Sequence, residues 1–110
     1  MSDANDIGAV LKRLEATIAV RKGADAKTSY TASLLAGGAQ KCAKKFGEEA
    51  VEAVLAAVSG DKQHLTAEAA DVLYHLLVML AEADVPLADV AAALAAREGT
   101  SGHDEKATRA

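Results

Sequence analysis

A single proline, Pro86, interrupts the 110 residues of this chain, and the large apolar side chains recur at helical spacing. Strand-like alternation of Val, Ile and Thr is absent throughout. The pattern therefore predicts an all-α fold, a small bundle of about four helices with one further short helical turn. The helices that we expect span about 5–21, 29–35, 39–59, 61–83 and 86–97.

Alanine limits what such a bundle can bury on its own. The chain is 51% hydrophobic, but 27 of its residues are alanines, which remove little apolar surface from water. A small domain with few large apolar side chains is only marginally stable alone, and association with a second copy is a common remedy. We therefore expect a homo-oligomer.

Charge and composition exclude several classes of protein. The net charge is −4, aromatic residues make up 3% of the chain and Trp is absent, which argues against a nucleic-acid binder with a basic stripe and stacking aromatics. No apolar run approaches the length that spans a bilayer, and the first residues lack the pattern of a secretory signal. The single cysteine, Cys42, fits a reducing compartment. We expect a cytoplasmic protein that binds neither nucleic acid nor membrane.

The two longest predicted helices are joined by a tight turn. Gly60 is a helix stop and Asp61 is a good N-cap for the helix that follows, so the two helices should form an antiparallel hairpin. Residues 1–97 form one domain in this interpretation. Residues 98–110 contain no apolar side chain larger than Ala, and we predict a disordered tail there.

Acidic residues gather on this predicted hairpin. At about 100° per residue, Glu48, Glu49 and Glu52 share a sector of the first helix with Lys41 and Lys45. On the second helix, Glu68 and Asp71 lie three residues apart, on the same side as His75. Counting from Gly60 places Glu52 level with Glu68, and Glu49 level with Asp71. Two acidic pairs can thus converge on one site.

Four carboxylates at one place repel one another at neutral pH unless a cation joins them. An all-oxygen site suits Mg²⁺, with Mn²⁺ as a substitute, and Mg²⁺ commonly shares its coordination with substrate phosphates. Lys41 and Lys45 could hold further phosphate charge. The alternative is a solvated acidic face in which Lys45 pairs with Glu48 or Glu49. His75 could orient a carboxylate or touch the substrate, or it could be a histidine satisfied near the core.

Several short motifs resemble a known enzyme family. "EEAVE" followed by "EAAD" is similar to the EExxE…ExxD signature of the all-α NTP pyrophosphatase (MazG-like) superfamily. Within it, "SYTASLL", "KCAKKFGEEAVEAV", "EAADVLYHLLVML" and "LADVAAALAAR" resemble the phosphoribosyl-ATP pyrophosphatases of histidine biosynthesis. The resemblance covers roughly residues 5–97.

This resemblance implies hydrolysis of phosphoribosyl-ATP to phosphoribosyl-AMP and pyrophosphate with Mg²⁺, the second step of L-histidine biosynthesis, by a homodimer of intertwined helices. It implies Mg-assisted attack of water on the α–β phosphate linkage. Glu48 would be a further ligand or the base that activates water, and Ser29 would either contact substrate or cap a helix. The implied metal ligands are Glu49, Glu52, Glu68 and Asp71. The implied substrate-binding residues are Lys41, Lys45, Ser29, Tyr30, Thr31 and His75.

Two other functions remain compatible with the residues themselves. A housekeeping pyrophosphatase acting on ordinary or modified nucleoside triphosphates would share the acidic set. A dimeric helical adaptor with a merely solvated acidic face would be no enzyme at all. Activity on phosphoribosyl-ATP and the response to Mg²⁺ separate these alternatives.

Overall fold

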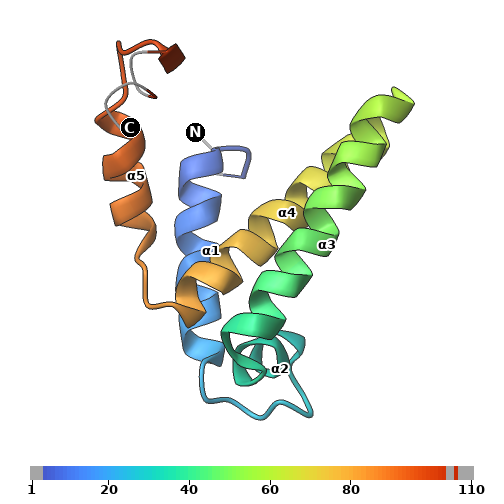
Figure 1. Ribbon diagram of the computed structural model, residues 1–110. Helices are drawn as coiled ribbons and strands as arrows, with labels where there is room; N and C mark the ends of the chain where they lie inside the picture. Colours follow the sequence, from blue (N-terminus) through green and yellow to red (C-terminus); the bar gives the residue numbers. More distant parts are fainter. Residues whose placement is uncertain (1–3, 104–105, 107–110) are drawn as a thin grey trace.

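The computed structural model describes residues 4–103 and 106, and these contain helices but no β-strand. The all-α prediction is therefore confirmed for this part of the chain (Figure 1). The predicted segments agree with the observed helices to within a few residues at each end. The helices are α1 (Ile7–Arg21), α2 (Tyr30–Ala36), α3 (Gly38–Ser59), α4 (Lys62–Glu82) and α5 (Leu87–Ala95).

Three helices begin with a side-chain cap. Asp6, Ser29 and Asp61 precede α1, α2 and α4, and each accepts a hydrogen bond from a backbone N–H in the first helical turn, at 3.0, 3.1 and 3.1 Å. Such caps satisfy N–H groups that have no partner within the helix. The cap at Asp61 was predicted, and capping was one of the two roles expected for Ser29.

The pair α3 and α4 forms the long antiparallel hairpin that the sequence predicts (Figure 1). Gly60 ends α3 in the left-handed conformation, with a φ of 79°. Glycine adopts this conformation without the penalty that a Cβ atom would incur. The turn at Gly60 thus fixes which residues of the two helices face each other.

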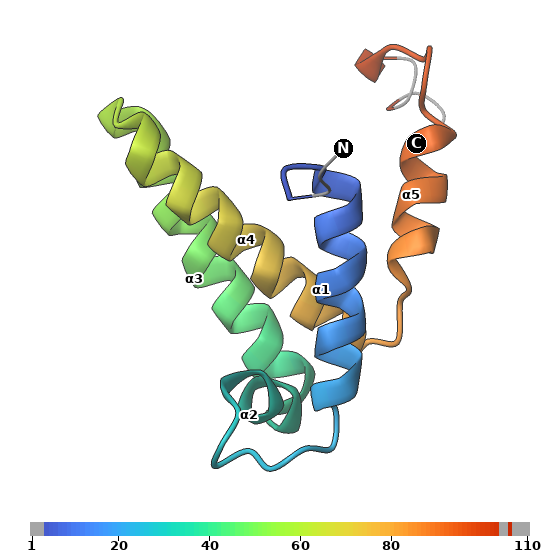
Figure 2. The same ribbon diagram turned by 180° about the vertical axis from the view of Figure 1, so that it is seen from behind.

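The largest cluster of buried side chains lies in one half of the hairpin. Helices α1 and α2 pack against the first part of α3 and the last part of α4, while the other half projects away from them (Figures 1 and 2). Cys42 belongs to this core, and burial raises the pKa of its thiol. The buried core cluster consists of Ile18, Leu34, Cys42, Leu77 and Val78.

The projecting half of the hairpin carries uncovered apolar side chains. Four of them follow one another along α3 at helical spacing, and the outermost, Val58, is 79% exposed. Among the described residues, α1 and α2 cover the other half of the hairpin and leave this stripe exposed (Figure 1). We call Val51, Val54, Leu55 and Val58 the α3 apolar stripe.

Helix α5 begins after Pro86 and lies beside α1 (Figure 2). Its first N–H, on Leu87, donates to the Glu15 carboxylate of α1 at 2.7 Å. Since the proline supplies no side-chain cap, this carboxylate takes that role from a neighbouring helix. A groove of about 500 Å³ runs between α1 and α5.

The predicted disordered tail, 98–110, falls partly outside the described residues, at 104–105 and 107–110. The described residues of this segment, 98–103 and 106, are exposed. Across the described part of the chain, the helices are too short or too polar to cross a bilayer.

Replacing Gly60 by Ala should lower the free energy of unfolding by about 1 kcal/mol, because Ala must adopt the left-handed conformation there. Gly47 offers a matched control in the same hairpin, since it lies inside α3 with open space around it. Gly47→Ala should raise the unfolding free energy by roughly 0.5–1 kcal/mol. Denaturant titrations of both variants measure the two changes, and effects of the same sign would contradict this account.

Candidate active site

Three carboxylates of the hairpin converge beside the covered half. Glu49 of α3 and Glu68 and Asp71 of α4 each offer an oxygen atom, and these atoms all lie within 4.8 Å of one another. Glu49 and Glu68 are half-buried, whereas Asp71 is exposed. We call these three residues the acidic group. The expected pairing of Glu49 with Asp71 across the hairpin is therefore present.

The acidic group has the chemistry of a site for a hard divalent cation. All its donors are carboxylate oxygens, which such ions prefer. The Oε2 atom of Glu68 is buried and has no hydrogen-bond partner within the described part of the chain. A buried, unpaired carboxylate oxygen is costly. A cation bound there would remove that cost, so the residues fit the metal that the sequence predicts.

His64 lies against this group from the preceding turn of α4. Its Nε2 atom is 3.4 Å from Oε1 of Glu68. Its side chain is half-exposed. Its contact with Glu68 was missed, although the i,i+4 spacing on a helix could have indicated it.

Glu52 differs from the expectation. It lies on the next turn of α3, is exposed and contributes no atom to the acidic group. The count from the turn placed it level with Glu68, but Glu68 lies with Glu49 and Asp71 instead. The structure therefore brings together three of the four expected carboxylates.

The cations next to the acidic group already have contacts of their own. Lys45 pairs with Glu48 at 3.2 Å, as the solvated-face alternative anticipated. The pKa of Lys45 is raised, first by its hydrogen bond with Glu48 and then by the charges of Glu48, Tyr30 and Glu49. Lys41 lies one turn earlier, and its Nζ donates to the carbonyl of Ser33 at 3.4 Å. Both lysines lie on α3 ahead of the acidic group.

Helix α2 brings the "SYT" segment to the same region. Ser29 caps α2, which is one of the two roles expected for its hydroxyl. Tyr30 is 57% exposed. Thr31 shares a hydrogen bond of 2.5 Å with the Tyr74 hydroxyl of α4. The segment is thus joined to α4 next to His75.

His75 is buried, at 6% exposure, between two aromatic rings. Its ring meets that of Tyr74 edge-on at 4.9 Å and that of Tyr30 edge-on at 6.3 Å, measured between centroids. Tyr74 was not among the site residues predicted from the sequence. Its bond to Thr31 was missed, because spacing along one helix does not reveal a partner 43 residues away.

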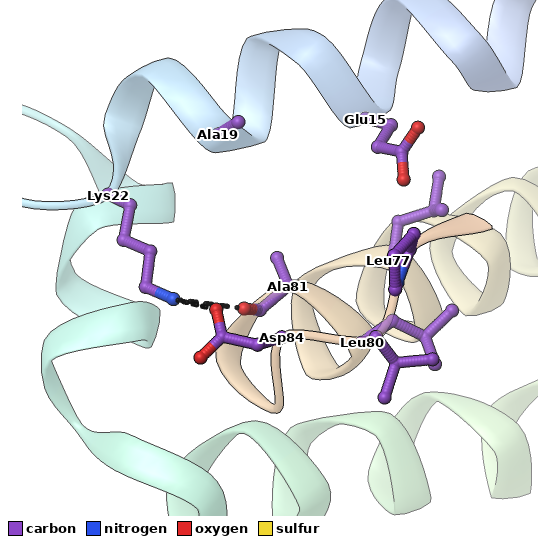
Figure 3. A pocket seen from close by; sticks show the side chains of 9 residues that line it. Glu15, Ala19, Lys22, Leu77, Leu80, Ala81 and Asp84 are labelled. Carbon is purple, nitrogen blue, oxygen red and sulfur yellow. Dashed lines mark hydrogen bonds and ion pairs between the residues drawn. The ribbon is translucent and has the colours of Figure 1, made fainter. Parts of the chain in front are cut away.

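A cavity of about 270 Å³ lies elsewhere, between α1 and the end of α4 (Figure 3). Lys22 spans its rim, with its Nζ 2.8 Å from Asp84 and 3.2 Å from the carbonyl of Ala81. None of the site residues predicted from the sequence lines this cavity. The candidate site is therefore the acidic group and its surroundings.

Residues 11–98 match the family described as phosphoribosyl-ATP pyrophosphohydrolase. The chain belongs to this family. The match begins inside α1 and extends just beyond α5, so it includes the acidic group, both lysines and the "SYT" segment.

Curated relatives are similar to this chain over nearly its whole length. A phosphoribosyl-ATP pyrophosphatase of Dinoroseobacter shibae is 69% identical over 100 residues, which are 91% of this chain and 98% of that protein. One from Cereibacter sphaeroides is 67% identical over 91% of this chain and 97% of its own length. One from Paracoccus denitrificans is 65% identical over 90% of this chain and 92% of its own length.

Proposed function

We propose that this chain hydrolyses phosphoribosyl-ATP to phosphoribosyl-AMP and pyrophosphate, the second step of L-histidine biosynthesis, at the acidic group of the hairpin. Membership of the family and the relatives' names support the activity. The observation that carries the site is the convergence of Glu49, Glu68 and Asp71, with one oxygen of Glu68 buried and unpaired.

The acidic group would hold Mg²⁺, with Mn²⁺ as a substitute. Its hard carboxylate donors and the unpaired Glu68 oxygen support this assignment. Glu52 would join the ligands by turning toward the group from the next turn of α3. A metal ion bound there would neutralise negative charge on the phosphates of the substrate.

The other residues would bind and orient the substrate. Lys41 and Lys45 carry positive charge toward the triphosphate, and Lys45 could exchange its contact with Glu48 for one with a phosphate oxygen. Water attacks the α-phosphorus, and the bond to the α–β bridging oxygen breaks so that pyrophosphate leaves. Glu48, freed from Lys45, is suited to accept the proton of the attacking water.

Tyr30 and His75 would contact the nucleoside part of the substrate. Tyr30 is exposed, and its ring meets that of His75 edge-on. Ser29 and Thr31 would hold this end of α2 in place rather than contact the substrate strongly, since each is engaged in a hydrogen bond within the protein.

A second copy of the chain would cover the α3 apolar stripe. The stripe is long, contiguous and uncovered within one chain, and exposed apolar patches of this kind commonly mark protein–protein contacts. Two hairpins joined along their stripes would form a four-helix arrangement, which agrees with the intertwined homodimer that the family resemblance implies.

Residues 1–97 would constitute the catalytic domain, and the chain would act in the cytoplasm without nucleic-acid or membrane partners. The reducing cytoplasm suits a lone, buried Cys42.

A pyrophosphate-release assay tests the proposed function. Purified protein should release pyrophosphate from phosphoribosyl-ATP in the presence of Mg²⁺ far faster than from any member of a panel of ordinary nucleoside triphosphates. Preference for a panel nucleotide would instead indicate a housekeeping pyrophosphatase.

A further inference from the structure

Two neighbouring residues of α2 contact two neighbouring residues of α4. Thr31 shares a hydrogen bond with Tyr74, and the ring of Tyr30 meets the ring of His75 edge-on. The rings of Tyr74 and His75 also contact each other within α4. These four residues form a closed set, which we call the α2–α4 quartet. Only one contact in it is a hydrogen bond between side chains.

Helix α2 depends on such contacts for its position. It has seven residues, which is shorter than a helix that is stable by itself in water. An exposed connector, 22–28, precedes it. Leu34 and Ala32 bury the far side of α2 in the core, but Tyr30 at its first turn is largely exposed. Ser29 caps this turn from within its own segment, and the hydrogen bond of Thr31 joins the turn to α4.

The first turn of α2 also faces the cations of the site. The Nζ of Lys41 donates to the carbonyl of Ser33 in this helix at 3.4 Å, and Tyr30 is, after Glu48, among the groups that raise the pKa of Lys45. A movement of this turn would displace Tyr30 from both Lys45 and His75. The hydroxyl of Tyr74 contacts neither of these residues through a hydrogen bond, and it can influence them through Thr31.

We propose that Tyr74 is a positioning residue for substrate binding: its hydroxyl, bonded to Thr31, fixes the first turn of α2 so that Tyr30 stands ready beside Lys45 and His75. This inference rests on the proposed function of the site and adds to it a residue that makes no substrate contact. Because the contact pre-forms the binding surface, its loss should weaken substrate binding and leave the chemical step unchanged.

Removing either hydroxyl tests the proposal. Tyr74→Phe and Thr31→Val should each raise KM for phosphoribosyl-ATP about fivefold, the factor that corresponds to ~1 kcal/mol for one hydrogen bond, with kcat within about twofold of the wild type. The double variant should be no worse than either single variant, because both remove the same contact. Thr31→Ser keeps the hydroxyl and should retain a KM near that of the wild type.

Thr17→Val is the matched control, since the Thr17 hydroxyl bonds only within α1, to the carbonyl of Arg13. Its KM should not change. All assays are run well below the unfolding temperature of each variant. The proposal would be overturned if Tyr74→Phe left KM unchanged or lowered kcat rather than raising KM. It would also be overturned if the rise in KM of the double variant were the product of the two single rises.

Hydrogen exchange of the free protein separates this proposal from the proposed function. Backbone amides of α2 should exchange faster in Tyr74→Phe and Thr31→Val, to the same extent in both, while those of α1 keep their rates. Unchanged exchange in α2 would refute the positioning role even in an active enzyme. A wild-type protein that does not hydrolyse phosphoribosyl-ATP would refute the function of the site, and the exchange rates would still decide whether Tyr74 fixes α2.

Discussion

Glu49→Gln should reduce pyrophosphate release from phosphoribosyl-ATP by roughly a thousandfold in kcat while the helices stay folded. The substitution removes one negative charge from the acidic group and keeps nearly the same side-chain volume. A metal at such a site stabilises developing phosphate charge by several kcal/mol, and each 1.36 kcal/mol corresponds to about a tenfold change in rate. Asp71→Asn should have a similar effect, because it removes a charge from the opposite helix of the same group.

The same variants should lose the stabilisation that Mg²⁺ gives the wild type. At a concentration about a hundredfold above its dissociation constant, a ligand adds about 2.7 kcal/mol of stability, which raises Tm by roughly 10 °C or more in a domain of this size. Glu49→Gln should show little of this shift. Without metal its Tm should equal or slightly exceed that of the wild type, since repulsion within the acidic group is reduced.

Glu98→Gln provides a control for this prediction. Glu98 is exposed, follows α5 and lies outside the acidic group. It should retain both activity and the Mg²⁺-dependent rise in Tm. Full activity in Glu49→Gln or Asp71→Asn would show that the metal site has been assigned to the wrong residues.

Val54→Asp should convert a dimer into a monomer. Val54 lies within the α3 apolar stripe and is 61% exposed in the single chain. If a second copy covers the stripe, the substitution buries a carboxylate without a partner in each subunit, at a cost of ~3 kcal/mol or more per copy. The two copies together should weaken the dimer by roughly ten-thousandfold.

Light scattering after gel filtration measures the mass of each variant over a range of concentrations. Val20→Asp is the matched control, because Val20 is similarly exposed but lies on α1, away from the stripe. It should remain dimeric. A wild-type protein that is monomeric, or a Val54→Asp variant that remains dimeric, would contradict the assignment of this stripe to the dimer interface.

Most of the fold could be predicted because helix boundaries depend on local chemistry. Gly60 and Asp61 determine the hairpin turn through a left-handed stop and a side-chain cap, and both act within a few residues. The link between α1 and α5 could not be predicted in this way. It depends on Glu15 accepting a hydrogen bond from Leu87, 72 residues further along the chain, and no periodicity reveals such a pair.

The candidate site shows the same division. Counting residues from the turn correctly predicted that Glu49 and Asp71 lie close together, because both helices are regular and the turn is short. The same count did not predict that Glu52 lies outside the acidic group. A residue's position along the helix axis does not determine the direction in which its side chain points around that axis. The contact of Thr31 with Tyr74 depends on how a short helix packs on a distant one, which a helical wheel does not contain.

The most direct test of this account is pyrophosphate release from phosphoribosyl-ATP, measured with purified wild-type protein before and after removal of divalent metal. We expect release of one pyrophosphate for each phosphoribosyl-AMP formed, loss of activity when metal is chelated, and recovery on addition of millimolar Mg²⁺. Unchanged hydrolysis after complete chelation, or no hydrolysis of phosphoribosyl-ATP with Mg²⁺ present, would contradict the proposal that the acidic group is a magnesium-dependent active site.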